Sequence, residues 1–573
     1  GNHIVKVTLD TTGAQWTIAS YLDGVQVATD YTYANNPPIG AVGITQTGLT
    51  VPSAVHWNYL SLGADGPGPT INTVNVTVNF PTNTGLPLNP AFNGMSYEKL
   101  AMTHNFFTSN NIPLVKLFSM VGPAVLRIGG GTVDTTGWNG ISNTIPITAS
   151  EVDTFAGFVK ALPTNWSVIY GINLLSNTPA NCAAEAAYAA NALGSRLLGF
   201  EIGNEPEFGF SSYNAFLARW RPLAAAITNA VPGWAVTNSG NGWTFAGADA
   251  GQGQLSAYTD PFASDESGKV SILTQHYYRA AGGSTNDTMQ LLLQPDSFLL
   301  KLTTNIVTAA AGHCPLGARI TECGSYSVGG VANVSDAFGA ALWSLDFMFT
   351  MALNGGQGIN FHGGGKSPYS PLTDNGTNVV SVGPEFYGLK MFSFLPRGNV
   401  IPATVTAVSN TNFTAYGVRQ ANGAISALLN NKSMNDMMTV SVNLGTNVIG
   451  AQLIELTGPS LYNTGGFTIG GATINPNGTW NGGVQATLPA TNGSVTVNVP
   501  PASAFLLNPV LDPPKIAFSV NGNRLRLNWP TNYVGWRLQS NSVGLATTNW
   551  FTVSGSINTN RMQFASQPGQ SNV

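Results

Sequence analysis

Two glutamates stand at the ends of β-rich runs in a chain that has few charged residues. Glu205 closes the run within residues 200–206, and Glu322 closes the run within residues 318–322. Two carboxyl groups that flank one bond are what glycosidic cleavage requires. One carboxylic acid protonates the leaving oxygen, and one carboxylate attacks or stabilises the anomeric carbon. The positions of these glutamates therefore indicate carbohydrate chemistry.

Each glutamate also has a structural alternative. Glu205 could stabilise the start of a helix through the helix dipole, and Glu322 could form an ion pair with Arg319. Only 8% of the 573 residues are charged, against about 25% in a typical soluble domain. In such a chain, a carboxylate at the end of a strand is informative, and we favour the catalytic interpretation.

The elements that must position these glutamates follow a β/α pattern. Eight β-rich runs alternate mostly with helical patterns over about 300 residues, which fits a (β/α)8 TIM barrel of the α/β class. Reactive groups of such barrels lie at the carboxyl ends of the strands, so runs four and seven would place both glutamates at one mouth. The predicted strands are 92–97, 124–129, 167–173, 198–204, 235–238, 271–277, 318–322 and 358–362.

Composition and periodicity predict further modules around the barrel. We expect a partial concanavalin-like β module, strands that join a later sandwich, the catalytic barrel, a C-terminal β-sandwich and a last small β module. Alternating apolar residues and turn signals support each β assignment. The predicted boundaries are 1–66, 70–90, 91–397, 398–509 and 515–573.

The charge balance excludes several classes of function. There are 22 Lys+Arg against 26 Asp+Glu, which gives a formal net charge of −4. No basic stripe is available for a phosphate backbone, so we expect no nucleic-acid partner. No apolar stretch of about 18 residues predicts a membrane span. The three cysteines and six histidines show no metal-ligand spacing. The abundance of Asn, Thr, Ser and Gly favours a secreted protein.

Several short motifs together resemble glycoside hydrolase family 79, the β-glucuronidase and heparanase-like group of clan A. The resemblance covers about residues 72–508, and its motifs occur in the family's order at comparable spacing. They lie at residues 94–98, 126–130, 201–206, 275–279, 321–322 and 335–338.

The resemblance implies a retaining double displacement, with Glu205 as acid/base and Glu322 as nucleophile. Retention requires carboxyl groups about 5–5.5 Å apart. Glu205 must carry a proton near neutral pH and give it to the leaving group. This mechanism needs neither a metal nor a cofactor, and we expect none.

The resemblance also implies residues that contact the sugar. Asn204 would bind the 2-hydroxyl, Tyr278 would hold Glu322 ionised, and Glu98 and Asp134 would accept hydrogen bonds from sugar hydroxyls. Each has a structural alternative: backbone capping for Asn204, core packing for Tyr278, and scaffold hydrogen bonds for the two acids.

A uronic acid carries a carboxylate that needs hydrogen-bond donors. By the resemblance, Tyr369 and the Gly-rich loop with Tyr326 and Gly329 would bind it. Lys366 is a further cation close to Tyr369 in the sequence. Gly131 departs from the family, in which Asn or Thr is frequent.

We therefore predict a retaining β-glucuronidase that acts on oligo- or polysaccharides with β-linked uronic acid. Two alternatives stay open at this point. One is a retaining β-glycosidase of the same clan that acts on a neutral sugar, and the other is a carbohydrate-binding protein with a catalytically inactive barrel.

Overall fold

The computed structural model divides the chain into two compact units, Gly1–Asn58 and Tyr59–Val573. In the first unit, β1 (Val5–Asp10) and β2 (Thr17–Leu22) pair antiparallel, and β3 (Val25–Gln26) and β4 (Tyr31–Thr32) add to β2. The structure describes residues 5–10, 15–22, 25–26, 31–32, 72–82, 85–141, 143–162, 166–231, 245–407, 411–541 and 548–565.

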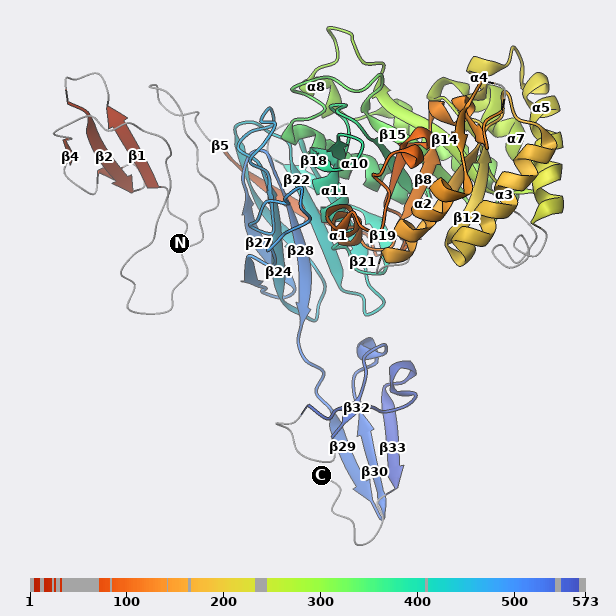
Figure 1. Ribbon diagram of the computed structural model, residues 1–573. Coiled ribbons are helices and arrows are strands. Elements are labelled where there is room, and N and C mark those ends of the chain that lie inside the picture. The colour runs from red at the N-terminus through yellow and green to blue at the C-terminus, as the bar shows by residue number, and fades with distance from the viewer. Residues whose placement is uncertain are drawn as a thin grey trace. The chain divides into compact units, whose positions relative to one another are not determined.

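A closed barrel of eight parallel strands forms the centre of the second unit (Figure 1). The strands are buried along almost their whole length, which agrees with their apolar sequences. This architecture confirms the predicted (β/α)8 fold. Its strands are β7 (Gly94–Glu98), β8 (Val125–Gly129), β11 (Ser167–Ile172), β12 (Leu197–Ile202), β13 (Phe245–Ala250), β14 (Val270–Ala280), β15 (Ala318–Tyr326) and β16 (Ile359–Gly363).

The fifth barrel strand differs from the sequence prediction. The predicted run at 235–238 lies outside the described residues, and β13 occupies the fifth place in the barrel. Its sequence, Phe-Ala-Gly-Ala-Asp-Ala, lacks the β-branched residues that normally mark a strand. Pairing with β12 and β14 compensates for this weak local preference.

Helices connect the barrel strands and surround the barrel (Figure 1). Several begin at residues that stabilise a helix start: Thr148 and Glu151 form a capping box on α2, and Asn111 caps α1. The helices are η1 (Lys99–Thr103), α1 (Ile112–Met120), η2 (Gly131–Thr135), α2 (Ala149–Ala161), η3 (Gly194–Arg196), α3 (Pro179–Leu193), α4 (Pro206–Gly209), α5 (Tyr213–Ala230), η4 (Gln252–Gln254), η5 (Leu255–Thr259), α7 (Asp260–Asp265), α8 (Met289–Leu292), α9 (Ser297–Ala310), α10 (Phe338–Leu353) and α11 (Pro384–Phe392).

A β-sandwich follows the barrel and encloses its own apolar core. One sheet has the order β20-β5-β23-β27, and the other contains β24, β28, β22, β21 and β19 with short strands at its edges. The strands are β5 (Asn72–Asn79), β6 (Leu86–Pro87), β19 (Asn399–Pro402), β20 (Thr404–Ala407), β21 (Phe413–Arg419), β22 (Ile425–Asn431), β23 (Asp436–Asn443), β24 (Val448–Thr457), β25 (Thr468–Ile469), β26 (Ala486–Pro489), β27 (Ser494–Val499) and β28 (Ser503–Leu511).

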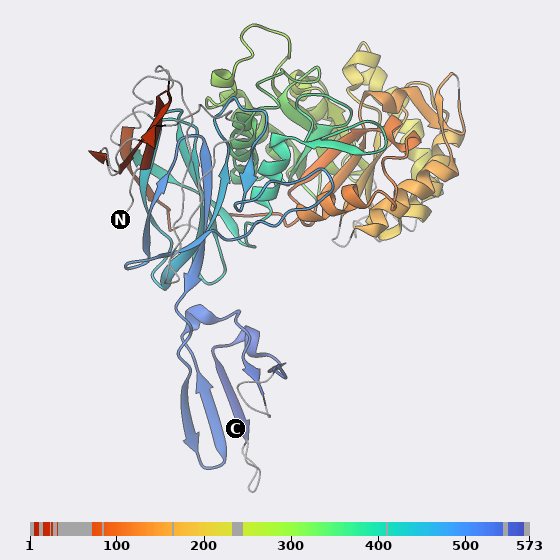
Figure 2. The ribbon, with the colours of Figure 1, turned by 60° about the vertical axis from the view of Figure 1, so that its left-hand side comes forward.

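Strand β5 precedes the barrel in sequence but belongs to the sandwich (Figure 2). It pairs in parallel with β23 and antiparallel with β20. Val74, Val76 and Val78 alternate with exposed residues and enter the sandwich core, as a half-buried strand should. The sandwich is therefore built from segments that precede and segments that follow the barrel in the sequence.

The barrel and the sandwich are joined through α10. Asp346 on this helix forms an ion pair with Lys432 and accepts a hydrogen bond from Asn430 at 2.9 Å. The rings of Phe349 and Tyr416 stack with centroids 4.4 Å apart. Polar and aromatic contacts therefore both link the two domains.

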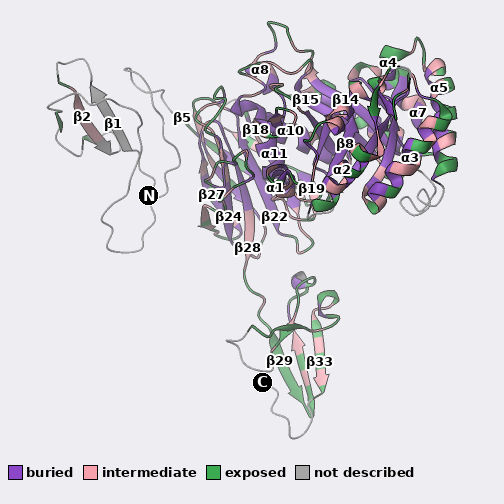
Figure 3. Cartoon of the chain, in the orientation of Figure 1, coloured by how far each residue is buried: buried purple, intermediate pink, exposed green. Residues whose placement is uncertain are grey.

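The C-terminal residues form small sheets with little core. β29 (Ala517–Asn521), β30 (Arg524–Asn528) and β33 (Arg561–Ala565) make one antiparallel sheet, and β31 (Gln539–Ser540) pairs with β32 (Phe551–Thr552). Figure 3 shows the contrast between the exposed β29 and the buried barrel strands. Within the described part of the chain, every helix is too short or too polar to cross a bilayer.

Candidate active site

Glu205 is held at a sharp turn between β12 and α4. Gly203 before it has φ +91°, and Glu205 itself has φ 43°, in the left-handed region. Its N–H donates to the carbonyl of Asp249 at 2.9 Å, and Pro206 starts the short helix α4. A non-glycine residue in this conformation is strained, and such strain is often found at functional sites.

Glu322 lies within β15, next to irregularities in the strand register. The register with β14 shifts between Gln275 and His276, and the register with β16 shifts between Ile320 and Cys323. A bulge re-aims side chains that would otherwise alternate. The bulge explains how Thr321, which donates to Asp249 at 2.8 Å, and Glu322 both reach the barrel interior.

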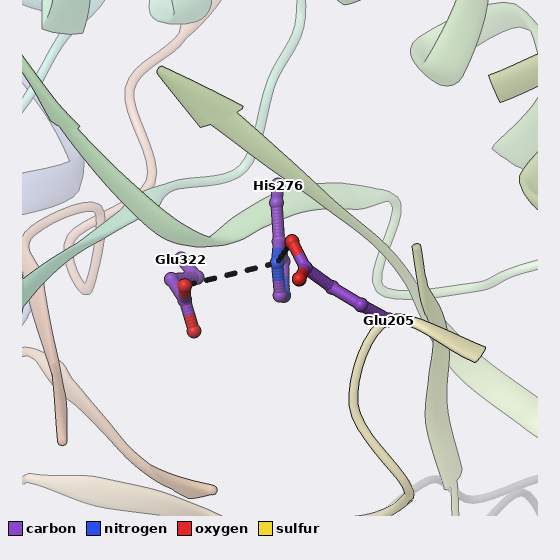
Figure 4. Close-up of side chains that lie close together, drawn as sticks. All are labelled: Glu205, His276 and Glu322. Carbon is purple, nitrogen blue, oxygen red and sulfur yellow. Dashed lines mark hydrogen bonds and ion pairs between the residues drawn. The ribbon is translucent and has the colours of Figure 1, made fainter. Parts of the chain in front are cut away.

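The carboxyl groups of Glu205 and Glu322 approach each other at the barrel mouth (Figure 4). One oxygen of each and a ring nitrogen of His276 all lie within 4.8 Å of one another. In Figure 4 the His276 ring stands between the two glutamates, with Nδ1 2.9 Å from Glu205 Oε1 and 3.9 Å from Glu322 Oε1. The two acids, far apart in sequence, therefore share one site.

Arg127 on β8 connects the acidic residues at the bottom of the site. Its Nη1 donates to Glu322 Oε2 at 2.7 Å, and its Nε donates to Glu201 Oε2 at 2.6 Å. Nη2 donates to Asn204 Oδ1 at 2.8 Å and also pairs with Asp249. Arg127 is completely buried. Burial of a guanidinium is costly unless it is paired, and these partners offset that cost.

His276 carries positive charge into the same network. Burial lowers the pKa of His276, but the charges of Asp249 and Glu322 outweigh this effect and raise it well above its ordinary value. Its Nε2 lies 2.8 Å from Asp249 Oδ1. A protonated imidazole donates at both nitrogens, so His276 donates to Asp249 and to Glu205.

The surroundings of Glu322 keep it ionised. Burial favours its neutral form, but His362, His276 and Arg127 lower its pKa far below the ordinary value, and a hydrogen bond from Tyr278 lowers it further. Tyr278 OH donates to Glu322 Oε1 at 2.9 Å. A nucleophilic carboxylate must be ionised, and this environment meets that requirement.

Glu98 and His362 form a second pair at the mouth. Thr132 donates to Glu98 Oε2 from its backbone N–H at 2.7 Å and from its hydroxyl at 2.5 Å. His362 Nε2 lies 3.5 Å from Glu98 Oε1, and its Nδ1 lies 3.6 Å from Glu322 Oε2. Burial lowers the pKa of His362, but Glu322 and Glu98 together raise it.

These side chains open into a cavity of about 530 Å³. Six of the residues predicted from the sequence line it, and the structure thus brings them together: Glu98, Asn204, Glu205, Tyr278, Glu322 and Tyr369.

The other predicted residues lie elsewhere. Asp134 is partly buried and accepts hydrogen bonds from the N–H groups of Leu174 and Leu175 at 2.6 and 3.1 Å. Tyr326 is buried and donates to the carbonyl of Thr288 at 2.8 Å. These hydrogen bonds stabilise the fold, because both side chains bond to backbone groups that are outside the cavity lining.

Gly329 is absent from the cavity lining, although its neighbours Ser327 and Val328 belong to it. Its carbonyl accepts the N–H of Tyr369 at 3.4 Å. Lys366 is exposed and does not line the cavity. Gly131 does line it, and a Cβ at this position would meet no atom within 4 Å.

The sequence analysis assigned no role to Arg127, Asp249, His276 or His362. The signal was present, since each is a charged or titratable residue inside a barrel strand. Arg127 and His276 lie within the motifs that carry the resemblance. Asp249 was missed because the fifth strand was placed too early in the chain.

A metal is not needed to explain the geometry. Glu205, His276 and Glu322 offer ligand-type atoms close together. However, His276 Nδ1 is hydrogen-bonded to Glu205, and Glu322 is paired with Arg127. Positive charge from Arg127 and His276 thus already fills the place that a cation would take. The three cysteines, Cys182, Cys314 and Cys323, are free and buried.

No protein-family model and no curated protein matches the sequence. Solved structures do match the fold. A 4-O-α-L-rhamnosyl-β-D-glucuronidase from Fusarium oxysporum 12S is 20% identical with a TM-score of 0.59, and the match covers 76% of this chain and 100% of that chain.

Two further enzymes match over a similar length. The GH51 arabinofuranosidase from Xanthomonas axonopodis pv. citri is 16% identical with a TM-score of 0.53, covering 76% of this chain and 100% of that chain. A family 44 xyloglucanase from Paenibacillus polymyxa is 11% identical with a TM-score of 0.51, covering 76% and 99%. At these identities the likeness shows the fold: the chain has a TIM-type barrel that it shares with glycoside hydrolases.

Proposed function

We propose that this protein is a retaining glycoside hydrolase that uses Glu205 as acid/base and Glu322 as nucleophile. The observation that carries the proposal is the approach of the two carboxyl groups, since one oxygen of Glu205 lies within 4.8 Å of one oxygen of Glu322. Inverting enzymes hold their carboxyl groups about 6.5–9.5 Å apart to leave room for a water, whereas retaining enzymes hold them about 5–5.5 Å apart.

In the first step, a carboxylate oxygen of Glu322 attacks the anomeric carbon. The bond from this carbon to the leaving oxygen breaks, and Glu205 gives its proton to that oxygen. His276 Nδ1 contacts Oε1 of Glu205, which leaves Oε2 to carry the proton. Arg127 and Tyr278 hold Glu322 in place for the attack.

In the second step, Glu205 removes a proton from a water molecule. The water oxygen attacks the anomeric carbon, and the bond to Glu322 breaks, which restores the carboxylate. During the covalent intermediate the charge of Glu322 is absent. Arg127 and His276 then face less negative charge, while His276 keeps its contact with Glu205 Oε1.

Substitution of the two glutamates tests the mechanism. We expect Glu322→Gly to lower kcat by several orders of magnitude, and azide to restore turnover with a glycosyl azide of inverted configuration as product. Glu205→Gly rescued by azide should give the retained configuration, because Glu322 still forms the intermediate.

Product configuration, followed by NMR, is the measurement. Thermal unfolding of both variants serves as the fold control. Near-normal turnover in either variant without azide, or an inverted product from the wild type, would refute the assignment.

For the substrate, we propose a β-linked glucuronic or related uronic acid at the end of or within a glycan. Support comes from Tyr369, which lines the cavity beside Tyr278 with ring centroids 5.9 Å apart. His362 also lines the cavity, and Glu322 and Glu98 raise its pKa despite its burial, which favours the protonated form. The structural neighbour from Fusarium oxysporum 12S, a 4-O-α-L-rhamnosyl-β-D-glucuronidase, is consistent with this substrate.

A second candidate is a β-glycosidase for a neutral sugar. The specific observation is the charge of the described lining, which holds four carboxyl groups and no lysine or arginine (Glu98, Glu205, Glu207 and Glu322). These carboxylates repel the carboxylate of a uronic acid. A neutral sugar meets no such repulsion and donates hydrogen bonds to them from its hydroxyls.

A panel of p-nitrophenyl glycosides separates the candidates. We expect the β-glucuronide to be cleaved with a kcat/KM at least tenfold above the β-glucoside, β-galactoside and β-xyloside. A preference for a neutral sugar would remove the uronate proposal and retain the mechanism. Binding of glycans without any hydrolysis would instead support the inactive-barrel alternative. A secreted location remains part of the proposal and is consistent with the composition.

A further inference from the structure

The side of the cavity that receives the leaving group can be located from α4. This helix starts one residue after Glu205, and the N–H of Phe208 donates to the carbonyl of Glu205 at 3.0 Å. The acid must reach the leaving oxygen, so residues that are fixed next to the acid lie beside the leaving group. Glu207 and Phe208, both on α4, line the cavity.

Phe208 presents an aromatic ring to this part of the cavity without a protein partner that covers it. The residue is 83% exposed, which is unusual for phenylalanine. Leu175, which is 47% exposed, supports the same helix, because a Cβ on Gly209 would lie 2.6 Å from its side chain. Phe208 is therefore held by a helix that packs on Leu175.

Glu207 adds a polar group next to this ring. Its Oε1 accepts the N–H of Gly251 at 2.8 Å, whereas its Oε2 is buried and has no hydrogen-bond partner among the described residues. A Cβ on Gly251 would lie 2.3 Å from Glu207 Oε1, so a larger residue there would displace this carboxyl group. Glu207 lines the cavity, which places its carboxyl group beside a sugar bound there.

We propose that Phe208 and Glu207 form a binding site for a sugar residue as the leaving group. The apolar face of the sugar ring packs on Phe208, and a hydroxyl of the same ring donates to the carboxyl group of Glu207. An aromatic ring beside a carboxyl group matches the two surfaces of a pyranose, one apolar and one rich in hydroxyls. The natural substrate is then an oligo- or polysaccharide rather than a small aryl conjugate.

This inference rests on the proposed function, and substrate choice separates the two. A β-glycosyl fluoride has a leaving group that needs neither a proton donor nor a leaving-group site. The comparison substrate is a disaccharide with the same first sugar. The quantity measured is the ratio of kcat/KM for the disaccharide to kcat/KM for the fluoride.

For Phe208→Ala and Glu207→Gln we expect this ratio to fall about 10- to 100-fold, a change typical of one lost stacking or hydrogen-bond contact. Phe208→Tyr should restore the ratio. Phe298→Ala is the matched control, because Phe298 is also an exposed phenylalanine but lies on α9, away from the cavity lining.

If the wild type does not cleave the fluoride, the proposed function fails. If it does, an unchanged ratio in Phe208→Ala refutes the leaving-group site. A p-nitrophenyl glycoside gives the third arm. An equal loss on this substrate and on the disaccharide would refute the preference for a sugar, because any aromatic leaving group would then suffice.

Discussion

Arg127 and Tyr278 approach Glu322 from two sides and bond to different oxygens. This arrangement fixes the rotation of the carboxylate as well as its charge. A nucleophile that is fixed in this way needs little reorganisation before it attacks. The two neighbours therefore contribute to the pH range of activity and to its rate.

Replacement of Tyr278 tests this contribution. Tyr278→Phe removes the donor that lowers the pKa of Glu322, so that pKa rises. We expect the acid limb of the kcat/KM profile to move to higher pH and kcat to fall about 10- to 100-fold.

Tyr277→Phe is the matched control, since Tyr277 is buried and its hydroxyl donates to Asp296 on the other face of β14. This variant should keep the wild-type pH profile. If both variants have the same pH profile, Tyr278 does not tune the nucleophile.

At the scale of the elements, the turn after β12 decides where Glu205, the proposed acid, stands. A Cβ on Gly203 would lie 2.7 Å from the Leu174 side chain, and φ there is +91°. We expect Gly203→Ala to lower the free energy of unfolding by about 1–3 kcal/mol and to displace Glu205, with a loss of activity.

Gly157 in α2 provides the comparison, because its Cβ would meet no atom within 4 Å. Gly157→Ala should raise the free energy of unfolding by about 0.5–1 kcal/mol and leave the rate unchanged. Urea unfolding and a standard assay measure both effects. Equal stability of the two variants would show that the turn tolerates a side chain.

The contribution of Asp134, which follows β8, to the stability of the fold depends on pH. Burial raises the pKa of Asp134 from 3.8 to about 6, even though backbone N–H groups lower it. The folded state thus binds a proton more tightly than the unfolded state. Between about pH 4 and pH 6 the unfolded Asp134 is ionised first, so the contribution of this residue to stability is present below about pH 4 and is lost as the pH rises to about 6.

Asp134→Asn removes this titration. The difference in unfolding free energy between wild type and Asp134→Asn should change by about 3 kcal/mol from pH 4 to pH 7, to the disadvantage of the wild type. Parallel curves over this range would show that Asp134 has an ordinary pKa.

The elements also show how much of the structure could be predicted from the sequence. The apolar strands β12 and β15 were predictable, and with them the approach of Glu205 and Glu322, although β15 continues past Glu322 to Tyr326 instead of ending there. The fifth strand was not, because Phe245–Ala250 has no local preference for a strand and is stabilised by its neighbours.

The direction in which side chains point was the other feature that the sequence did not predict. Strict alternation along a strand would turn Thr321 and Glu322 to opposite faces, but a bulge brings both inward. Asp134 and Tyr326 have the right positions in the sequence for sugar contacts, yet their side chains end on backbone groups. Bulges and loop paths depend on tertiary contacts that a single sequence does not display.

At the scale of the molecule, Asp346 holds the barrel to the sandwich. Besides its ion pair with Lys432, it accepts hydrogen bonds from Thr414 at 2.6 Å and Tyr416 at 3.0 Å. Lys432 is only 4% exposed. Removal of Asp346 would leave a buried ammonium group without its partner, which is costly.

We expect Asp346→Leu to lower the free energy of unfolding by about 3–5 kcal/mol. The double variant Asp346→Leu with Lys432→Met should recover a large part of this loss, because neither charge then stays unpaired. Urea unfolding followed by tryptophan fluorescence measures both. A double variant as unstable as the single one would show that the ion pair itself, and not the stranded charge, determines the cost.

The place of β5 has a consequence for how the protein is made. Asn72 pairs with Asp436 across the two parallel strands, so this segment leaves the ribosome long before its partner exists. The whole barrel must be synthesised while Val74, Val76 and Val78 have no core to enter. We therefore expect β5 to dock late, as the closing step of assembly. Any shortened gene that starts at the first barrel strand would produce a sandwich with an open seam.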